Sequence, residues 1–198
     1  GFSLRGHVTK IYNAILNTEV FQKITILVIP VGIMSYGLMN FFPSFLVEQR
    51  GFSSNVAGIL YMVYMALNVP GKTFAGYAMD KKGVRFSMLA SLMLALTGLI
   101  MFTVIPGMWF LAIALLLFAP ARGGIFTLMH TYLLQSLPDQ ISDLLYGFFM
   151  VILTLTGAIG PAITGLLVDS YGYLVSFAFL IVVFGLALPF VFYFIGRK

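Results

Sequence analysis

The sequence GYAMDKKG at residues 76–83 has a counterpart later in the chain, GLLVDSYG at residues 165–172. Both follow the pattern Gly-x-x-x-Asp-x-x-Gly, and the second begins 89 residues after the first. Each stretch closes a long apolar segment. The polar turn near residues 48–53 maps by the same offset onto the turn near residues 137–142. The chain therefore contains one plan twice, and each copy has three apolar segments.

The rest of the chain is strongly apolar. Hydrophobic residues make up 61% of the 198 positions and charged residues 9%, whereas a soluble domain carries roughly a quarter charged residues. A helix of about 20 apolar residues spans a bilayer core, so we expect an all-α membrane protein embedded in the lipid bilayer. Six transmembrane helices are predicted, at residues 24–47, 56–79, 86–105, 109–134, 144–168 and 174–195.

The first 23 residues differ in kind from the rest. They carry Arg5, His7, Lys10, Glu19 and Lys23, and they are predicted to form a polar, partly amphipathic segment on the cytoplasmic membrane surface. Residues 24–196 are predicted to form the transmembrane bundle. The chain begins at a glycine without the features of a signal peptide, so we expect a fragment or a processed half of a longer protein.

Three is an odd number of membrane crossings, so the second copy of the plan must enter the bilayer from the opposite side. This arrangement is a 3+3 inverted repeat, the plan of six-helix halves in many secondary transporters. Lys and Arg gather on cytoplasmic loops, and the net charge of +5 follows that rule rather than indicating a nucleic-acid partner. We expect both termini to be cytoplasmic, in a plasma or inner membrane. The inner segments then hold Arg5, Lys10, Lys23, Lys81, Lys82, Arg85, Arg197 and Lys198, and the outer loops hold Arg50.

Composition excludes several kinds of chemistry. The chain has no cysteine and two histidines, which excludes disulfides, thiolate metal sites and cysteine nucleophiles. No metal site or cofactor is predicted. A membrane-embedded enzyme would need a buried Ser–His pair, a His-Glu-x-x-His motif or paired acids, and none of these can be assembled convincingly. We therefore expect no enzyme, although a membrane-embedded enzyme and a non-transporting membrane scaffold stay as alternatives of another class.

Three motifs resemble those of the major facilitator superfamily. The run Gly76-x-x-x-Asp80-Lys81-x-Gly83-x-Arg85 resembles the loop between helices 2 and 3 of each half, with Phe86 in place of the usual second basic residue. The run Gly157-Ala-Ile-Gly160-Pro161-x-x-x-Gly165 is similar to the Gly-Pro-rich fifth or eleventh helix of the family. Arg122-Gly123-Gly124 is weakly similar to its Arg-containing fourth-helix motif.

The connection after residue 168 is most similar to the one between the eleventh and twelfth helices of that family. The chain therefore resembles a C-terminal half, helices seven to twelve. This resemblance implies a partner, either an N-terminal six-helix half or a second copy. It also implies a mechanism in which two halves rock about a central site and expose it alternately to each side.

The first motif is interpreted as part of a cytoplasmic gate. A loop carboxylate can accept bonds from exposed N–H groups at a nearby helix start, and the helix at 144–168 begins on the same side. The predicted gating residues are Gly76, Asp80, Lys81, Gly83, Arg85, Asp139 and Asp143, where the last two pair with Lys82 or Arg85 when this side closes. Small residues let helices approach closely, which predicts packing at Gly157, Gly160, Pro161 and Gly165.

Two cations lie within predicted helices, where a charge costs about 2.5–3.5 kcal/mol or more at the bilayer centre. Arg122 either pairs with an anionic group of a substrate or bonds structurally to another helix. Lys72 either snorkels to the interface or faces a cavity. Helical spacing places Lys72 on a polar stripe. The predicted cavity residues are Arg122, Lys72, Asn68, Tyr64, Tyr61, Asn40 and Tyr36.

The helices at 86–105 and 174–195 contain no charged residue and are predicted to face lipid, which leaves the other four to line the cavity. His130 is either a proton carrier near neutral pH or a satisfied structural residue.

Two buried cations and no buried acids favour secondary active transport of a small organic anion by alternating access. The alternative is efflux of a neutral or cationic amphiphile, which is compatible with 20 Phe and 10 Tyr.

Overall fold

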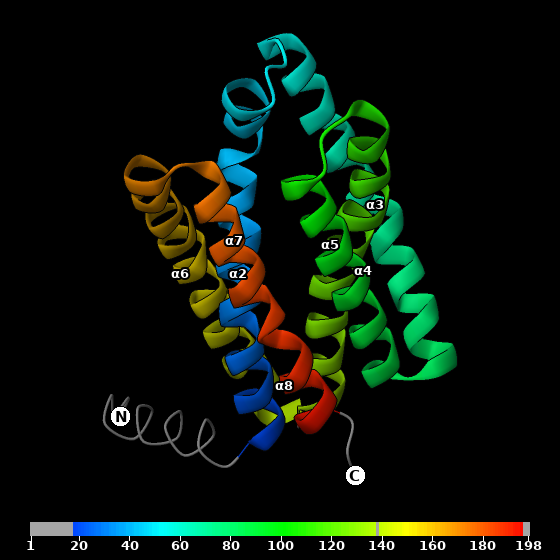
Figure 1. The fold of residues 1–198 in the computed structure, drawn as a ribbon. Coiled ribbons are helices and arrows are strands. Elements are labelled where there is room, and N and C mark those ends of the chain that lie inside the picture. The colour runs from blue at the N-terminus through cyan, green and yellow to red at the C-terminus, as the bar shows by residue number, and fades with distance from the viewer. Residues whose placement is uncertain (1–17, 138, 196–198) are drawn as a thin grey trace.

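The computed structural model describes residues 18–137 and 139–195, and every regular element in them is helical (Figure 1). The elements follow the six predicted spans in order; α2 and η1 together form the first span, and α7 and α8 form the sixth. The elements are α2 (Glu19–Ser44), the π-helical η1 (Phe45–Gln49), α3 (Ser54–Lys82), α4 (Val84–Val104), α5 (Met108–Ser136), α6 (Asp139–Tyr171), α7 (Tyr173–Gly185) and α8 (Ala187–Phe194).

Five of these six spans are both long enough and apolar enough to cross a membrane. The sixth, α3, has the length, with 29 residues, but not the hydropathy. Its interior carries Asn68 and Lys72, and its last turn carries Asp80 and two lysines. The weak hydropathy of α3 therefore comes from polar groups inside a helix of membrane-spanning length.

The first helix begins earlier than the sequence predicts. Because α2 starts at Glu19, residues 19–23 belong to the bundle rather than to a separate polar segment. The Nζ of Lys23 lies 2.6 Å from a carboxylate oxygen of Glu19 one turn earlier, and such a pair stabilises an exposed helix end. The remaining predictions for the N-terminal segment and for the last two basic residues fall on residues 1–17 and 196–198, outside the described part of the chain.

The last span is broken, which the sequence reasoning does not foresee. Helix α7 ends at Gly185 and α8 begins at Ala187. Pro189 explains the break, because its nitrogen has no hydrogen to donate to the carbonyl of Gly185 and its ring clashes with that carbonyl.

The helices pack in two groups of three (Figure 1). In one group α2 packs along α6 and against α7, and in the other α5 packs along α3 and α4. Under the 89-residue offset α2 corresponds to α5 and α3 corresponds to α6. The α2–α6 pair is therefore the counterpart of the α5–α3 pair, and the helix packing obeys the internal repeat.

The two Gly-x-x-x-Asp-x-x-Gly stretches end in the same kind of corner. Gly83 has φ 81° and ψ 163°, and Gly172 has φ 80° and ψ 172°, a region essentially restricted to glycine. The N–H of Gly83 donates to the carbonyl of Met79 at 2.9 Å, and that of Gly172 donates to the carbonyl of Val168 at 2.8 Å. The α3–α4 corner lies where α2 begins and α8 ends, whereas the α6–α7 corner lies at the opposite end (Figure 1). The repeat is therefore inverted, as the sequence predicts.

Matched glycines also set the helix crossings. A side chain at Gly71 would collide with the backbone of Pro120 on α5, and a Cβ at Gly160 would lie 2.7 Å from the carbonyl oxygen of Ile33 on α2. Gly160 follows Gly71 by the same 89 residues. Each copy of the repeat therefore has one close crossing at the same position.

Arg50 ties the connection between η1 and α3 to the end of α4. Its Nη2 donates to the carbonyl oxygens of Phe102 at 2.8 Å and Thr103 at 2.9 Å. These carbonyls belong to the last turn of α4, where no intrahelical partner exists. Partial burial lowers the pKa of the Arg50 guanidinium from its ordinary value.

Candidate functional site

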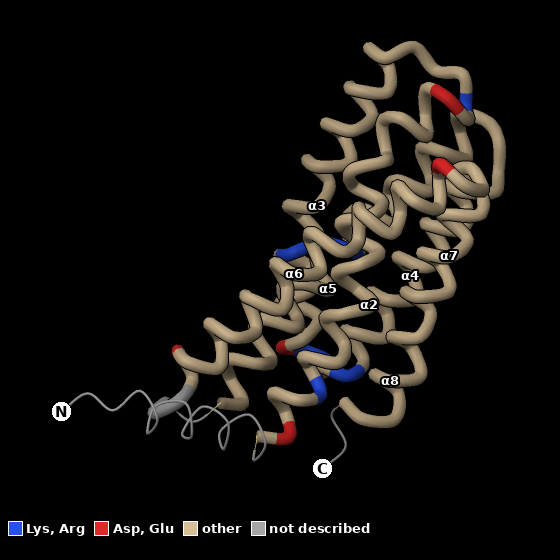
Figure 2. The backbone as a smooth tube through the Cα atoms, turned by 90° about the vertical axis from the view of Figure 1, so that its left-hand side faces the viewer, with Lys and Arg blue, Asp and Glu red and all other residues tan. Residues whose placement is uncertain are grey.

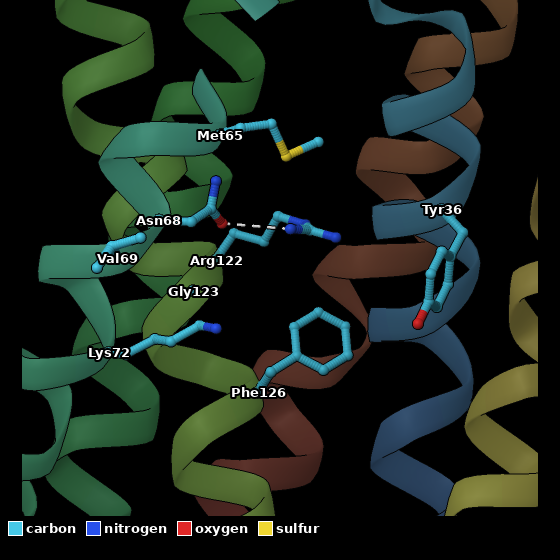
Figure 3. Close-up of a pocket in the computed structure, with 8 residues that line it drawn as sticks. All are labelled: Tyr36, Met65, Asn68, Val69, Lys72, Arg122, Gly123 and Phe126. Carbon is cyan, nitrogen blue, oxygen red and sulfur yellow. Dashed lines mark hydrogen bonds between the residues drawn. The ribbon is translucent and has the colours of Figure 1, made fainter. Parts of the chain in front are cut away.

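A cavity of about 310 Å³ lies between α2 on one side and α3 and α5 on the other (Figure 3). The residues that line it are Tyr36, Met65, Asn68, Val69, Lys72, Arg122, Gly123 and Phe126. Four of the seven predicted cavity residues are thus brought together, from three helices that are separate in the sequence.

Arg122 extends from α5 into this cavity (Figure 3). Its Nη1 donates to the Oδ1 of Asn68 at 3.2 Å. Its Cζ lies 5.3 Å from the ring centroid of Phe126 and 5.8 Å from that of Tyr64, a range in which a cation is attracted to the ring face. The Nε of Arg122 is buried and has no hydrogen-bond partner among the described residues. One donor of the fork is therefore held and another is unsatisfied.

Lys72 reaches the same cavity one turn after Asn68 on α3 (Figure 3). None of the described residues that line the cavity is acidic. Among the described side chains, those of residues 18–137 and 142–195, the ion pair found is Lys23 with Glu19, at the far end of α2. The two cavity cations are therefore not neutralised within the described part of the chain.

The other three predicted cavity residues lie beside the cavity rather than in its lining. Tyr64 is fully buried, with its ring 5.1 Å from that of Phe42 and 5.8 Å from that of Phe118. Tyr61 lies about one turn beyond the part of α3 that lines the cavity, where its ring packs against Phe42 at 5.7 Å. Asn40 is exposed and donates to the carbonyl of Tyr36 at 2.9 Å. Aromatic packing thus closes the cavity at the level of Tyr61 and Tyr64.

Four lining residues were not predicted as cavity residues from the sequence: Met65, Val69, Gly123 and Phe126. Phe126 follows Arg122 by four residues, which places it one turn along the same face of α5; this spacing would have identified it. Met65 lies three residues before Asn68 and seven before Lys72, on the same face of α3; this spacing would have identified it, although its side chain is apolar.

The basic residues of the predicted gate contact aromatic rings and a helix end. The Nη2 of Arg85 donates to the carbonyl of Phe192 at 2.6 Å, and its guanidinium lies 4.9 Å from the ring centroid of the same residue. Lys82 lies 4.7 Å from the ring centroid of Phe86, the residue that replaces the second basic residue of the family motif. Lys81 similarly lies 5.7 Å from the ring of Tyr77. The Arg85 contacts connect the α3–α4 corner to α8, whereas those of Lys81 and Lys82 stay within the corner.

The predicted pairs of Asp143 with Lys82 or Arg85 are not formed among the described residues. Asp80 and Asp143 are exposed, and neither forms an ion pair among the described residues. The side chain of Asp139 lies outside the described residues. No atom lies within 4 Å of the position of a Cβ at Gly76, so packing within the described chain does not require glycine there.

Helix α6 does not reach the cavity, in contrast to the expectation that four helices line it. It packs against α2 through small residues: a Cβ at Gly165 would lie 3.2 Å from the ring of Phe41, and one at Gly157 would lie 3.8 Å from the ring of Tyr36. Pro161 lies inside α6 without ending it. Only 22% of the apolar window of α6 is buried within the described chain, and α6 packs mainly on α2, with none of its described residues in the cavity lining.

His130 lies half-buried where α5 meets α6. Its Nδ1 is 3.3 Å from the hydroxyl of Tyr146, and its ring meets that of Phe149 edge-on at 5.1 Å. The Nε2 has no hydrogen-bond partner among the described residues. It lies two turns from Arg122 on the same face of α5.

A family model tests the resemblance that the six spans, the inverted repeat and the motifs at its corners indicate. The family model described as Major Facilitator Superfamily matches residues 24–198. The chain belongs to the major facilitator superfamily. It is therefore an integral membrane protein of a transporter family, and the resemblance found in its motifs is confirmed.

Curated relatives carry the name of a drug-resistance protein. The "Putative multidrug resistance protein MdtD" of Klebsiella pneumoniae (strain 342) is 31% identical over 147 residues, which are 71% of this chain and 31% of that protein. The protein of the same name from Cronobacter sakazakii (strain ATCC BAA-894) is 29% identical over 146 residues, 72% of this chain and 31% of that protein. The matched part thus spans less than a third of the length of these relatives.

Solved structures of peptide transporters share the fold. The crystal structure of the peptide transporter POT in complex with sulfate has a TM-score of 0.81 at 15% identity and covers 88% of this chain and 37% of that chain. The POT family transporter PepTSo has a TM-score of 0.80 at 16% identity, with coverage of 88% and 37%. At these identities the likeness concerns the fold alone, which is one six-helix half of the major facilitator type.

Proposed function

We propose that this chain is the C-terminal half of a secondary active transporter that moves a small organic anion by alternating access. The observation that carries the proposal is the charge of the cavity. Arg122 and Lys72 both line it, and none of its described lining residues is acidic. An anionic ligand would supply the counter-charge that the described residues lack.

Arg122 and Lys72 both lie in the interior of helices of membrane-spanning length. A central Arg or Lys costs about 2.5–3.5 kcal/mol or more, and a neutral amide such as Asn68 offsets little of that cost. A guanidinium binds a carboxylate or phosphate with two parallel hydrogen bonds. Tyr36 and Phe126 would flank the apolar body of such a ligand. The bond from Arg122 to Asn68 also fits a structural arginine, so the proposal needs a test that separates the two roles.

A second candidate function is efflux of a neutral or cationic amphiphile. The observation that favours it is the identity of 31% to a relative named for multidrug resistance. Aromatic and thioether side chains at the cavity, Phe126 and Met65 among them, suit an apolar body. The two candidates differ in one measurable property, which is whether removal of the Arg122 charge weakens or strengthens binding.

A partner half and an orientation belong to the proposal. An N-terminal six-helix half, or a second copy, would complete the path and cover exposed apolar side chains of α6 such as Val151 and Leu166. Figure 2 draws basic positions gathered at the end where α2 begins and α8 ends, which we assign to the cytoplasm of a cell with this protein in its plasma or inner membrane. Crosslinking of the two halves in native membranes would test the partner.

Two further roles are proposed at the cytoplasmic end. The gate would close when Asp139 or Asp143 pairs with Lys82 or Arg85, so Asp143→Asn should alter transport rate more than binding.

His130 would carry a proton, so His130→Gln should remove the dependence of uptake on an imposed pH gradient. An unchanged response to the gradient in that variant would leave His130 a structural residue that contacts Tyr146.

The central experiment is Arg122→Gln in the intact protein. We expect equilibrium binding of organic carboxylates to weaken about ten- to a hundredfold, because a charge-assisted hydrogen bond contributes roughly 1.5–3 kcal/mol. Arg122→Lys should lose less, and Lys23→Gln serves as a matched control because it removes a cation at the far end of α2, outside both the cavity and the predicted gate. Unchanged carboxylate binding in folded Arg122→Gln would reject the anion proposal, and stronger binding of cations would favour efflux of amphiphiles.

A further inference from the structure

Asn68 holds Arg122 through its side-chain amide, and two hydrogen bonds allow this amide only one orientation. Its Nδ2 donates to the backbone carbonyl of Tyr64 at 2.6 Å, and its Oδ1 accepts from the Nη1 of Arg122 at 3.2 Å (Figure 3). A carbonyl oxygen can only accept and a guanidinium can only donate. The reversed amide would therefore break both hydrogen bonds. Asn68 is 7% exposed, so little solvent is available to replace either bond.

The helix crossing keeps this contact in place. A side chain at Gly123, next to Arg122 on α5, would collide with the backbone of Asn68 on α3. The absence of that side chain brings the two helices together at the level of the Arg122–Asn68 bond. The rings of Tyr64 and Phe126 lie near the guanidinium of Arg122. Asn68 is the hydrogen-bond acceptor found for this guanidinium among the described residues.

A neutral acceptor and a charged one would have opposite effects at this position. An aspartate has nearly the same size as asparagine and could place a carboxylate oxygen at the same point. It would form an ion pair with Arg122 at low dielectric, where pairing is strong, and the guanidinium charge would no longer be available to a ligand. The amide fixes the guanidinium in position without consuming its charge.

We propose that Asn68 is a positioning residue that sets the charge selectivity of the cavity. This inference rests on the proposed function and deepens it: the substrate class is a compound with one carboxylate or similar acidic group on an apolar body. The neutral side chain at position 68 keeps the anion preference, and a carboxylate at position 68 removes it. Lys72 alone, one turn away on α3, would then provide the remaining positive charge.

The test compares ligands of nearly the same size and shape in which a charged carboxylate is replaced by a neutral amide. Binding of benzoate and benzamide, and of hexanoate and hexanamide, is measured by equilibrium binding to the purified intact protein and its variants. We expect the unaltered protein to prefer the carboxylate of each pair, and Asn68→Asp to reduce that preference at least tenfold. Asn68→Leu, which keeps the Arg122 charge but loses its acceptor, should reduce the preference by only two- to fivefold.

A double-mutant cycle separates positioning from a purely structural role. If Asn68 acts through Arg122, Asn68→Leu should leave the carboxylate preference unchanged in the Arg122→Gln background, because coupled residues are not additive. An equal loss in both backgrounds would overturn the inference, as would an unaltered preference in folded Asn68→Asp. Loss of preference in Arg122→Gln but not in Asn68→Asp would reject this inference alone. No carboxylate preference in the unaltered protein would reject the proposed function as well.

Discussion

Three arginines of this chain, Arg50, Arg85 and Arg122, place the same guanidinium group in two kinds of surroundings. Arg50 donates to two carbonyl oxygens at the end of α4 and Arg85 to one at the end of α8, where their charge also meets the negative end of the helix dipole. Arg122 donates to one neutral side chain and lines the cavity. The first two roles depend on carbonyls that lie 52 and 107 residues away in the chain, so sequence spacing gives no sign of them.

The capping role of Arg50 leads to a prediction on stability. Arg50→Gln should lower the free energy of unfolding by about 1–2 kcal/mol, because two carbonyls of the last turn of α4 lose a charged donor. Thermal unfolding of the intact protein in detergent would measure the change. Arg50→Lys should recover part of it, and Lys81→Gln should stay within about 0.5 kcal/mol. Equal stability of Arg50→Gln and the unaltered protein would show that the two hydrogen bonds contribute nothing.

At the residue scale, charge was the most informative part of the sequence for the site. An Arg or Lys inside an apolar helix is costly enough to indicate a cavity, and helical spacing then placed Asn68 on the face of Lys72. Tyrosine was a poor guide because its ring packs as well as it lines a cavity, and Tyr64 is fully buried against other rings. Aromatic packing along α3 decides which residues of the polar stripe line the cavity, and the sequence does not show how far that packing extends.

At the scale of elements, the two corners of the repeat make a matched pair. Gly83→Ala and Gly172→Ala should each destabilise the protein by about 1–3 kcal/mol, because both backbones lie in a region that only glycine occupies without strain. Gly58→Ala is the control: no atom lies within 4 Å of its Cβ position inside α3, so it should be neutral or stabilise by about 0.5–1 kcal/mol. Chemical or thermal unfolding would rank the three variants.

A large difference between the two corner variants would contradict the structural equivalence of the corners.

Element positions followed closely from the apolar segments, since length and composition decide where a helix can span a bilayer. The break at Leu186 was missed although Pro189 is visible in the sequence. Other helices here, α5 and α6 among them, contain a proline without ending, so proline alone did not indicate which span breaks.

At the scale of the whole molecule, corresponding helices of the inverted repeat contribute differently to the cavity. The repeat relates α3 to α6 and α2 to α5, yet α3 carries Asn68 and Lys72 where the corresponding positions of α6 are Gly157 and Pro161. Helix α3 therefore supplies polar groups at the cavity, whereas its counterpart α6 supplies the small residues with which it packs against α2. The same helix of the plan lines the cavity in the first copy and packs against α2 in the second, while the second copy contributes Arg122 through α5.

The topology itself can be tested in cells. The chain has no cysteine, so a single cysteine at Lys82 or at Tyr171 reports the side on which each corner lies. Tyr171 is 69% exposed and should react with a membrane-impermeant maleimide in intact cells when replaced by cysteine, as should the Gln49→Cys control near the same end. Lys82→Cys should react only after the cells are permeabilised, because its corner lies at the basic end. Reaction of Lys82→Cys and Tyr171→Cys from the same side would remove the inverted arrangement, and with it the physical basis for a path that opens alternately to each side.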